Sequence, residues 1–312
     1  MFSRVALASN INPSLPIAER TMAKRKEIDN NREEEPESQE SSSEESSSDD
    51  DTNMLDVEFE WFDPQPEHDF HGLKTLLRQL FDVDAQSFDL SALTDLILAQ
   101  PLLGSTVKVE GNETDPYAFL TVLNLHEHKD KPVIDKMISY IRAQAKGHEA
   151  LAKLDGLVQD SDSARVGLVL TERLVNIPSE VVPPMYKMLL EEISWAIEEK
   201  EPYNFTHYLI LSKIYREIAS ALDGKDPPES KKQKKAGKKG NSELFYFHPE
   251  DEVLQRYASC FGSYEYLVEG AKSDSKRTFQ ELGIKPEGHM ILIEASKFEA
   301  AVKGLQEYFS QS

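Results

Sequence analysis

The sequence predicts an α/β fold in which a mixed sheet carries helices on both faces. Apolar segments with strand-like and helix-like spacing alternate from about residue 55 to the C-terminus. Val166–Leu170 is an unbroken apolar run, typical of a strand that is covered on both sides. A long amphipathic pattern follows it, up to Lys200. Because no fixed-period repeat is present, we expect a single domain over residues 54–312 rather than a solenoid.

The expected elements follow from periodicity and from breaks at proline and glycine. Pro183 and Pro184 fit the first turn of the long helix, and Ser179 is placed to cap it. Strands are expected over residues 57–61, 106–109, 117–125, 166–170, 205–214, 244–247, 261–268 and 289–294, and helices over residues 69–81, 90–99, 130–141, 151–158, 179–200 and 297–309, with a short helical stretch from Pro249.

The formal charge of −21 is concentrated near the N-terminus. Residues 27–63 carry 16 acidic side chains against one arginine, Arg32, and residues 33–51 contain no apolar residue that could contribute to a hydrophobic core. This composition predicts that residues 1–53 form a disordered acidic and serine-rich tail. Two interpretations of the tail stay open: it solubilises the chain, or it grips a basic partner directly. The candidate partner-binding residues are Glu33, Glu34, Glu35, Glu44, Glu45, Asp49, Asp50 and Asp51.

A second charged segment interrupts the folded region at residues 223–241, where we expect a mobile lysine-rich loop. Its candidate nuclear-import residues are Lys231, Lys232, Lys234, Lys235, Lys238 and Lys239. Direct nucleic-acid contact is the weaker interpretation, because no aromatic side chain for base stacking lies among these lysines.

The residues give little support for an enzyme or a metal protein. Cys260 is the single cysteine, and the pairs His126/His128 and His68/His71 lack the further ligands that a metal site needs. We interpret these histidines as surface residues. Glu172 and Arg173 follow the buried strand, a place where α/β sheets carry functional residues, but a structural ion pair is the preferred interpretation. We expect no catalytic, cofactor-binding or metal residues, and no segment that inserts into a membrane.

Several segments together resemble the BCP/BCCIP family of eukaryotic proteins. The most specific is residues 166–178 with Pro184, Met185 and Tyr186. The others are residues 57–60, 72–74, 76–81, 104–108 and 208–213, and Leu305 with Tyr308. This resemblance covers about residues 54–312 and implies a fold similar to the N-acetyltransferases that use acetyl-CoA. The pyrophosphate-binding turn of those enzymes, which opens a helix with glycines, has no match here.

The resemblance also implies a nuclear, non-enzymatic binding protein that could shuttle to the cytoplasm. Such a protein escorts a basic large-subunit ribosomal protein, contacts the nuclear transport machinery and takes part in nuclear export and ribosome biogenesis. Two alternatives stay open: an acyltransferase with a divergent acetyl-CoA site, and a cell-cycle or DNA-repair scaffold without chaperone activity.

Overall fold

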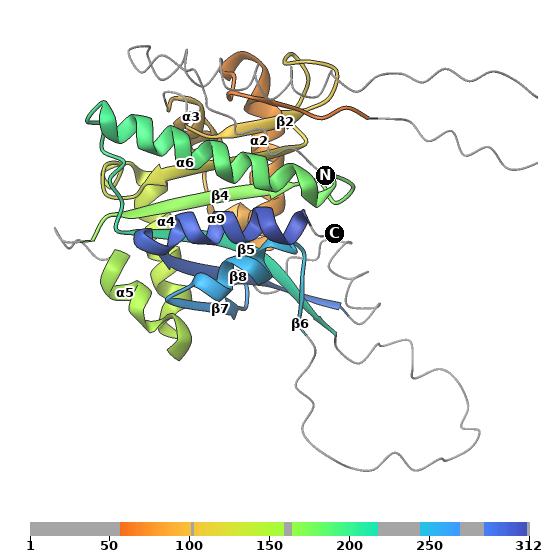
Figure 1. Ribbon diagram of the computed structural model, residues 1–312. Coiled ribbons are helices and arrows are strands. Elements are labelled where there is room, and N and C mark those ends of the chain that lie inside the picture. The colour runs from red at the N-terminus through yellow and green to blue at the C-terminus, as the bar shows by residue number, and fades with distance from the viewer. Residues whose placement is uncertain (1–56, 101–102, 159–163, 218–243, 269–283, 311–312) are drawn as a thin grey trace, which may run out of the picture.

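The computed structural model describes residues 57–100, 103–158, 164–217, 244–268 and 284–310. The predicted tail, with its acidic partner-binding candidates, and the predicted lysine-rich loop, with its import candidates, lie outside the described residues. The described strands form one mixed sheet in the order β1-β2-β3-β4-β5-β8-β7, with β6 also paired to β5 (Figure 1). Within it, β4 and β5 are parallel and the other pairs are antiparallel.

The elements occur close to where the periodicity places them. The first half contains β1 (Glu60–Phe62), α2 (Pro66–Phe81), the 3-10 turn η1 (Asp82–Ser87), α3 (Leu90–Leu98), β2 (Ser105–Lys108), β3 (Ala118–Asn124), α4 (Pro132–Lys146), η2 (Glu149–Leu151) and α5 (Ala152–Val158). The second half contains β4 (Val166–Arg173), η3 (Ser179–Val181), α6 (Val182–Glu198), β5 (His207–Glu217), β6 (Leu244–Tyr246), α7 (Glu250–Leu254), η4 (Gln255–Tyr257), β7 (Cys260–Tyr264), β8 (Ile284–Glu294) and α9 (Ala295–Phe309).

The predicted two-faced packing is confirmed, because successive residues of the central strands alternate between two hydrophobic cores. Leu168 and Leu170 of β4 join the core under α2, α3, α4 and α5. Val169, between them, joins the core under α6 and α9. Figure 1 shows α6 and α9 together on one side of the sheet. Among the described residues, no helix is both long enough and apolar enough to cross a bilayer.

Some predicted boundaries are wrong for local physical reasons. Ser179 does not cap α6: it begins the turn η3, and α6 starts after Val181 without a side-chain cap. Helix α2 begins at Pro66 rather than at Asp69, because proline at the first position has no N–H group to leave unpaired. The strand expected over residues 261–268 ends at Tyr264.

Candidate functional site

The parallel strands β4 and β5 separate at one end of the sheet and leave a fork between them. Their pairing runs from Val166 and His207 to Leu170 and Leu211. Beyond that point β4 continues beside β3 as far as Arg173, while β5 takes β6 as a new neighbour from Ile214 onward. Ligands of α/β sheets commonly bind outside the carboxyl ends of such strands. The fork is therefore the first place to look for function.

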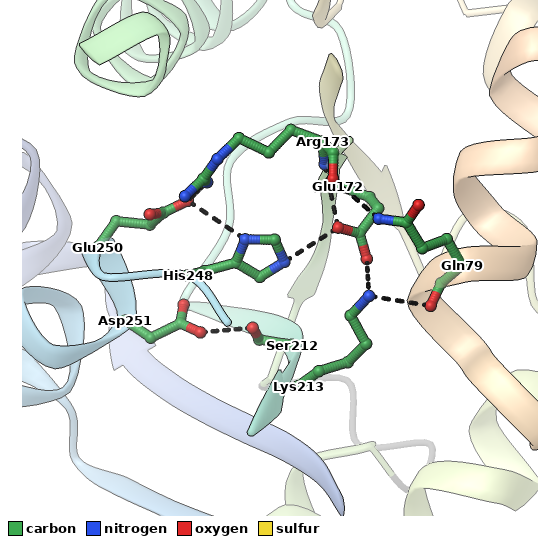
Figure 2. A network of polar contacts seen from close by, with 8 residues as sticks. All are labelled: Gln79, Glu172, Arg173, Ser212, Lys213, His248, Glu250 and Asp251. Carbon is green, nitrogen blue, oxygen red and sulfur yellow. Dashed lines mark hydrogen bonds and ion pairs between the residues drawn. The ribbon is translucent and has the colours of Figure 1, made fainter. Parts of the chain in front are cut away.

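Charged side chains fill this fork and pair with one another (Figure 2). The carboxylate of Glu172 lies between two cations, with Oε2 2.5 Å from Lys213 Nζ and Oε1 3.1 Å from His248 Nε2. Arg173 forms an ion pair with Glu250 of α7. All five side chains are buried. Burying unpaired charges costs several kcal/mol, so this mutual pairing is what allows them to lie inside the protein.

Polar side chains also satisfy the backbone of β4 at the fork. The Arg173 N–H donates to Glu172 Oε1 at 3.0 Å, and the Arg173 carbonyl accepts from Gln79 Nε2 at 2.8 Å. Lys213 Nζ also donates to the carbonyl of Gln79 at 3.0 Å. Through these contacts α2, β4 and β5 are bonded together. The backbone groups of Arg173, where a ligand inserted between the strands would bond, are thus already occupied.

The titration of Glu172 makes it a poor general base. Burial raises the pKa of this carboxyl, but His248 and Lys213 outweigh the burial and lower the pKa to about 2. Burial lowers the pKa of His248, whereas Glu172 and Glu250 raise it to a net value above the ordinary one. Because effective bases have a pKa near the working pH, Glu172 acts here as a fixed negative charge.

Ser212, His248 and Asp251 are also close together, but they do not form a nucleophilic triad. A triad needs a serine hydroxyl that is bonded to the histidine. The Ser212 hydroxyl instead donates to Asp251, whose pKa is raised by burial. Among the described residues, no hydrogen bond joins Ser212 to His248. Ser212 and Asp251 are buried and do not line the surface cleft that opens beside the fork, so a substrate in that cleft would not reach them.

A large surface cleft of about 1160 Å³ opens beside the fork. Helix α2 and the turn η1 form one wall, and the segment Leu174–Ile177 with Phe247 and His248 forms another. Val175, on that segment, has 96% of its surface exposed. Glu172, Arg173 and Lys213 lie on the floor of the cleft. The volume is slightly above the roughly 300–1,000 Å³ that small-molecule sites occupy.

Glu172 and Arg173, the two candidate residues that follow the buried strand, both lie at the fork. Glu172 and Arg173 are held in ion pairs, as expected, but with Lys213, His248 and Glu250 rather than with each other. Sequence reasoning missed these partners. A signal did exist in β5, where Ser212 and Lys213 interrupt an otherwise apolar strand and so require buried partners.

Neither histidine pair is joined by a further metal-ligating side chain among the described residues. His68 and His71 are exposed, and His126 and His128 are half-buried. Asp69, between the first two, is fully buried and lies 2.6 Å from Lys108 Nζ on β2, an ion pair that sequence reasoning also missed. No cluster of three or more potential metal ligands occurs in the part of the chain that the structure describes.

Comparison with known proteins identifies the family. The BCCIP family model matches residues 54–254. Protein bcp1 from Aspergillus fumigatus is 60% identical over 289 residues, which cover 92% of this chain and 98% of that protein. Protein bcp1 from Schizosaccharomyces pombe is 49% identical over 261 residues, covering 83% and 92%. The crystal structure of BCP1 from Saccharomyces cerevisiae matches with a TM-score of 0.56 and 27% identity, over 83% of this chain and 93% of that one.

These matches confirm the resemblance drawn from the sequence, and the residues that the family model matches, 54–254, include the charged fork between β4 and β5. The chain belongs to the BCCIP family.

Proposed function

We propose that this protein is a non-enzymatic nuclear escort that shields a basic client, foremost a large-subunit ribosomal protein, and takes part in its export and in ribosome biogenesis. Family membership supports the proposal at a general level. The structural observation that supports the proposal most is the fork between β4 and β5, where the charged side chains are paired with one another. A fork used in this way holds α2, α7 and the sheet together as a rigid support for a binding surface.

The charge distribution favours a basic client. Opposite charge steers association and excludes wrong partners, whereas each exposed charge pair stabilises a complex by only about 0–1 kcal/mol. In this proposal the acidic residues 33–51 therefore accelerate and strengthen binding, and the folded surface selects the client. The lysines from Lys231 to Lys239 serve nuclear import, and direct contact with nucleic acid is not part of the proposed function.

The salt dependence of client binding tests the role of the tail. We expect binding of a purified basic large-subunit ribosomal protein to weaken as salt rises, because ions screen exposed charges over about 8 Å at physiological ionic strength. Deleting residues 33–51 should weaken binding at low salt and flatten the salt dependence. A control that replaces the same acidic residues by glutamine and asparagine should behave like the deletion. If the dependence of client binding on salt concentration is unchanged in both variants, the proposal that residues 33–51 bind the client directly is refuted.

An acyltransferase is the second candidate, and one observation favours it: the cleft lies at the carboxyl ends of the parallel pair β4 and β5. The likeness to acetyltransferases inferred from the sequence remains part of this candidate. Against it stand the low pKa of Glu172 and the bonded backbone of Arg173. Calorimetric titration with acetyl-CoA distinguishes the acyltransferase from the escort. Saturable heat of binding would establish a cofactor site, and we expect no such heat.

A cell-cycle or DNA-repair scaffold is the third candidate, and it makes a different prediction about solubility. An escort keeps an otherwise insoluble basic client in solution when both are co-expressed, whereas a scaffold has no such effect. We expect co-expression with a basic large-subunit ribosomal protein to increase the soluble fraction of that protein.

A further inference from the structure

The charged side chains at the fork include two carboxylates and two cations that balance one another. Glu172 Oε2 lies 2.5 Å from Lys213 Nζ, and Glu250 is ion-paired with Arg173 (Figure 2). Lysine and arginine are protonated near neutral pH. Burial raises the pKa of Glu172, but His248 and Lys213 lower it to about 2, so this carboxylate is ionised. The two ion pairs therefore add no net charge to the fork.

His248 and Asp251 are the two further titratable side chains of this network, and both are buried, at 5% and 1% exposed. The His248 ring lies between the two carboxylates, with Nε2 3.1 Å from Glu172 Oε1 and Nδ1 3.8 Å from Glu250 Oε1. Asp251 accepts a hydrogen bond from the Ser212 hydroxyl (Figure 2). These contacts join the start of α7 to β4 and β5.

Titratable side chains on the neighbouring elements are neutral or occur as opposite charges in equal number. Burial raises the pKa of Tyr186 on α6 and of Tyr266 after β7 well above the ordinary value, so both stay neutral. Burial lowers the pKa of His289 on β8 to about 4, and Glu287 on the same strand lies 3.0 Å from Arg216. The other charged neighbours are Glu252 with Arg256 on α7 and η4, Lys297 and Lys303 with Glu299 and Glu307 on α9, and Lys74 and Arg78 with Asp82 and Asp89 along the cleft.

The charge of the buried network therefore depends on the number of protons that the pair His248 and Asp251 holds. With one proton the network is neutral, either as an imidazolium and a carboxylate or as an imidazole and a carboxylic acid. With no proton it contains a buried carboxylate without a cation, and with two it contains a buried cation without a carboxylate. Because an uncompensated buried charge is strongly destabilising, the folded protein favours one proton on the pair.

The titration of the two groups agrees with this count. Burial raises the pKa of Asp251 to about 7. Burial lowers the pKa of His248, but Glu172, Glu250 and Asp251 raise it above its ordinary value. In an exposed segment, an aspartate titrates near pH 3.9 and a histidine near pH 6.5, so above pH 7 the pair would hold almost no proton. Opening of the network above pH 7 therefore releases about one proton.

We propose that one proton shared by His248 and Asp251 holds residues 247–254 against the fork, and that this segment loosens when alkaline pH removes the proton. Phe247 and His248 line the cleft beside the fork, so the proton controls one wall of that cleft. The proposal does not depend on the escort function or on any client, and it can be tested on the protein alone.

Hydrogen exchange of backbone amides in the full-length chain tests this proposal. The Gln255 N–H donates to the Asp251 carbonyl at the end of α7, and the Ala99 N–H donates to the Asp95 carbonyl at the end of α3, which gives a matched amide outside the network. After correction for the intrinsic exchange rate, the opening constant at Gln255 should rise by about threefold to tenfold from pH 7 to pH 8, because opening releases about one proton. The opening constant at Ala99 should not follow it.

A smaller rise at Gln255, below about threefold, would overturn the proposal. An equal rise at Gln255 and Ala99 would also overturn it, because the proton would then stabilise the whole fold rather than the segment that carries α7.

The double variant His248→Gln, Asp251→Asn makes the network neutral without a proton. Its opening constant at Gln255 should change by less than about twofold from pH 7 to pH 8. The control Glu252→Gln removes an exposed carboxylate from the same helix and should keep the wild-type pH dependence. Wild-type pH dependence in the double variant would overturn the proposal, and so would its loss in Glu252→Gln.

NMR spectra of the wild-type chain count the protons directly, so the proposal stays testable if the double variant does not fold. The ring nitrogen shifts of His248 and the carboxyl carbon shift of Asp251 report the protonation of each group. At pH 7.5 we expect one proton on the pair. An imidazole beside an ionised carboxylate would overturn the proposal, and so would an imidazolium beside a carboxylic acid.

Discussion

Replacing Glu172 by glutamine should destabilise the protein strongly while leaving its shape almost unchanged. Glutamine keeps the size of the side chain but removes the charge that neutralises Lys213 and His248. The shift of the Glu172 pKa from 4.5 to about 2 corresponds to about 3 kcal/mol of stability at neutral pH. Removing one partner of a buried ion pair costs a similar amount, about 3–5 kcal/mol.

Urea unfolding followed by tryptophan fluorescence measures this loss, because Trp61 and Trp195 lie in the folded part. We expect Glu172→Gln to lower the free energy of unfolding by about 3–4 kcal/mol without changing the denaturant slope. The control is Glu252→Gln on the neighbouring helix, whose partner Arg256 lies 3.0 Å away in solvent. That exposed pair should contribute less than about 1 kcal/mol. Adding Lys213→Met to Glu172→Gln should recover part of the loss.

The pH dependence of stability tests independently whether Glu172 stabilises the protein as a charged carboxylate. Since the pKa of Glu172 is lower in the folded protein, its contribution is full above pH 4.5 and disappears as the pH falls towards about 2. The difference in stability between wild type and Glu172→Gln should therefore shrink over that range. A loss below about 1 kcal/mol at pH 7, or a difference independent of pH, would refute the account of the network.

Three further predictions concern other parts of the chain. Lys108→Met should lower the free energy of unfolding by about 3–5 kcal/mol at pH 7, because it leaves the Asp69 carboxylate buried without its cation. Burial raises the pKa of Asp69, so this carboxylate becomes neutral at low pH and the loss should be smaller there. Urea unfolding that gives equal losses at pH 7 and at low pH would contradict this prediction. Gly104→Ala should destabilise by about 1–3 kcal/mol, because φ is +110° and the new Cβ would lie 2.5 Å from the Leu120 carbonyl, whereas Gly147→Ala, with open space around it, should be neutral or stabilising in thermal unfolding. Replacing the six lysines from Lys231 to Lys239 by glutamine should move a fluorescent fusion from the nucleus to the cytoplasm, and unchanged nuclear fluorescence would refute their role in import.

The fold could be predicted from the sequence to the extent that hydrophobic periodicity determines it. The uninterrupted run Val166–Leu170 correctly indicated a strand covered on both faces. Helix α9 was recovered because its apolar residues repeat at helical spacing. The pairing order of the strands could not be derived in the same way, since it depends on contacts between distant segments such as β5 and β8.

The site could be predicted only in part, because the residues that pair with one another in it are far apart in the sequence. Glu172 and Arg173 were found from their place after a buried strand. Their partners Lys213, His248 and Glu250 are 40 or more residues away in sequence, and nothing in local periodicity links them. The interruption of β5 by Ser212 and Lys213 was a usable signal, since a lysine in a buried strand requires an acid nearby.

Affinity purification of the full-length chain from nuclear extract at two salt concentrations tests the central claim most directly. The account predicts that a basic large-subunit ribosomal protein co-purifies near stoichiometry at low salt and is reduced at high salt, and that a chain lacking residues 33–51 retains less of it at low salt. Recovery of no basic ribosomal protein at either salt concentration would contradict the account.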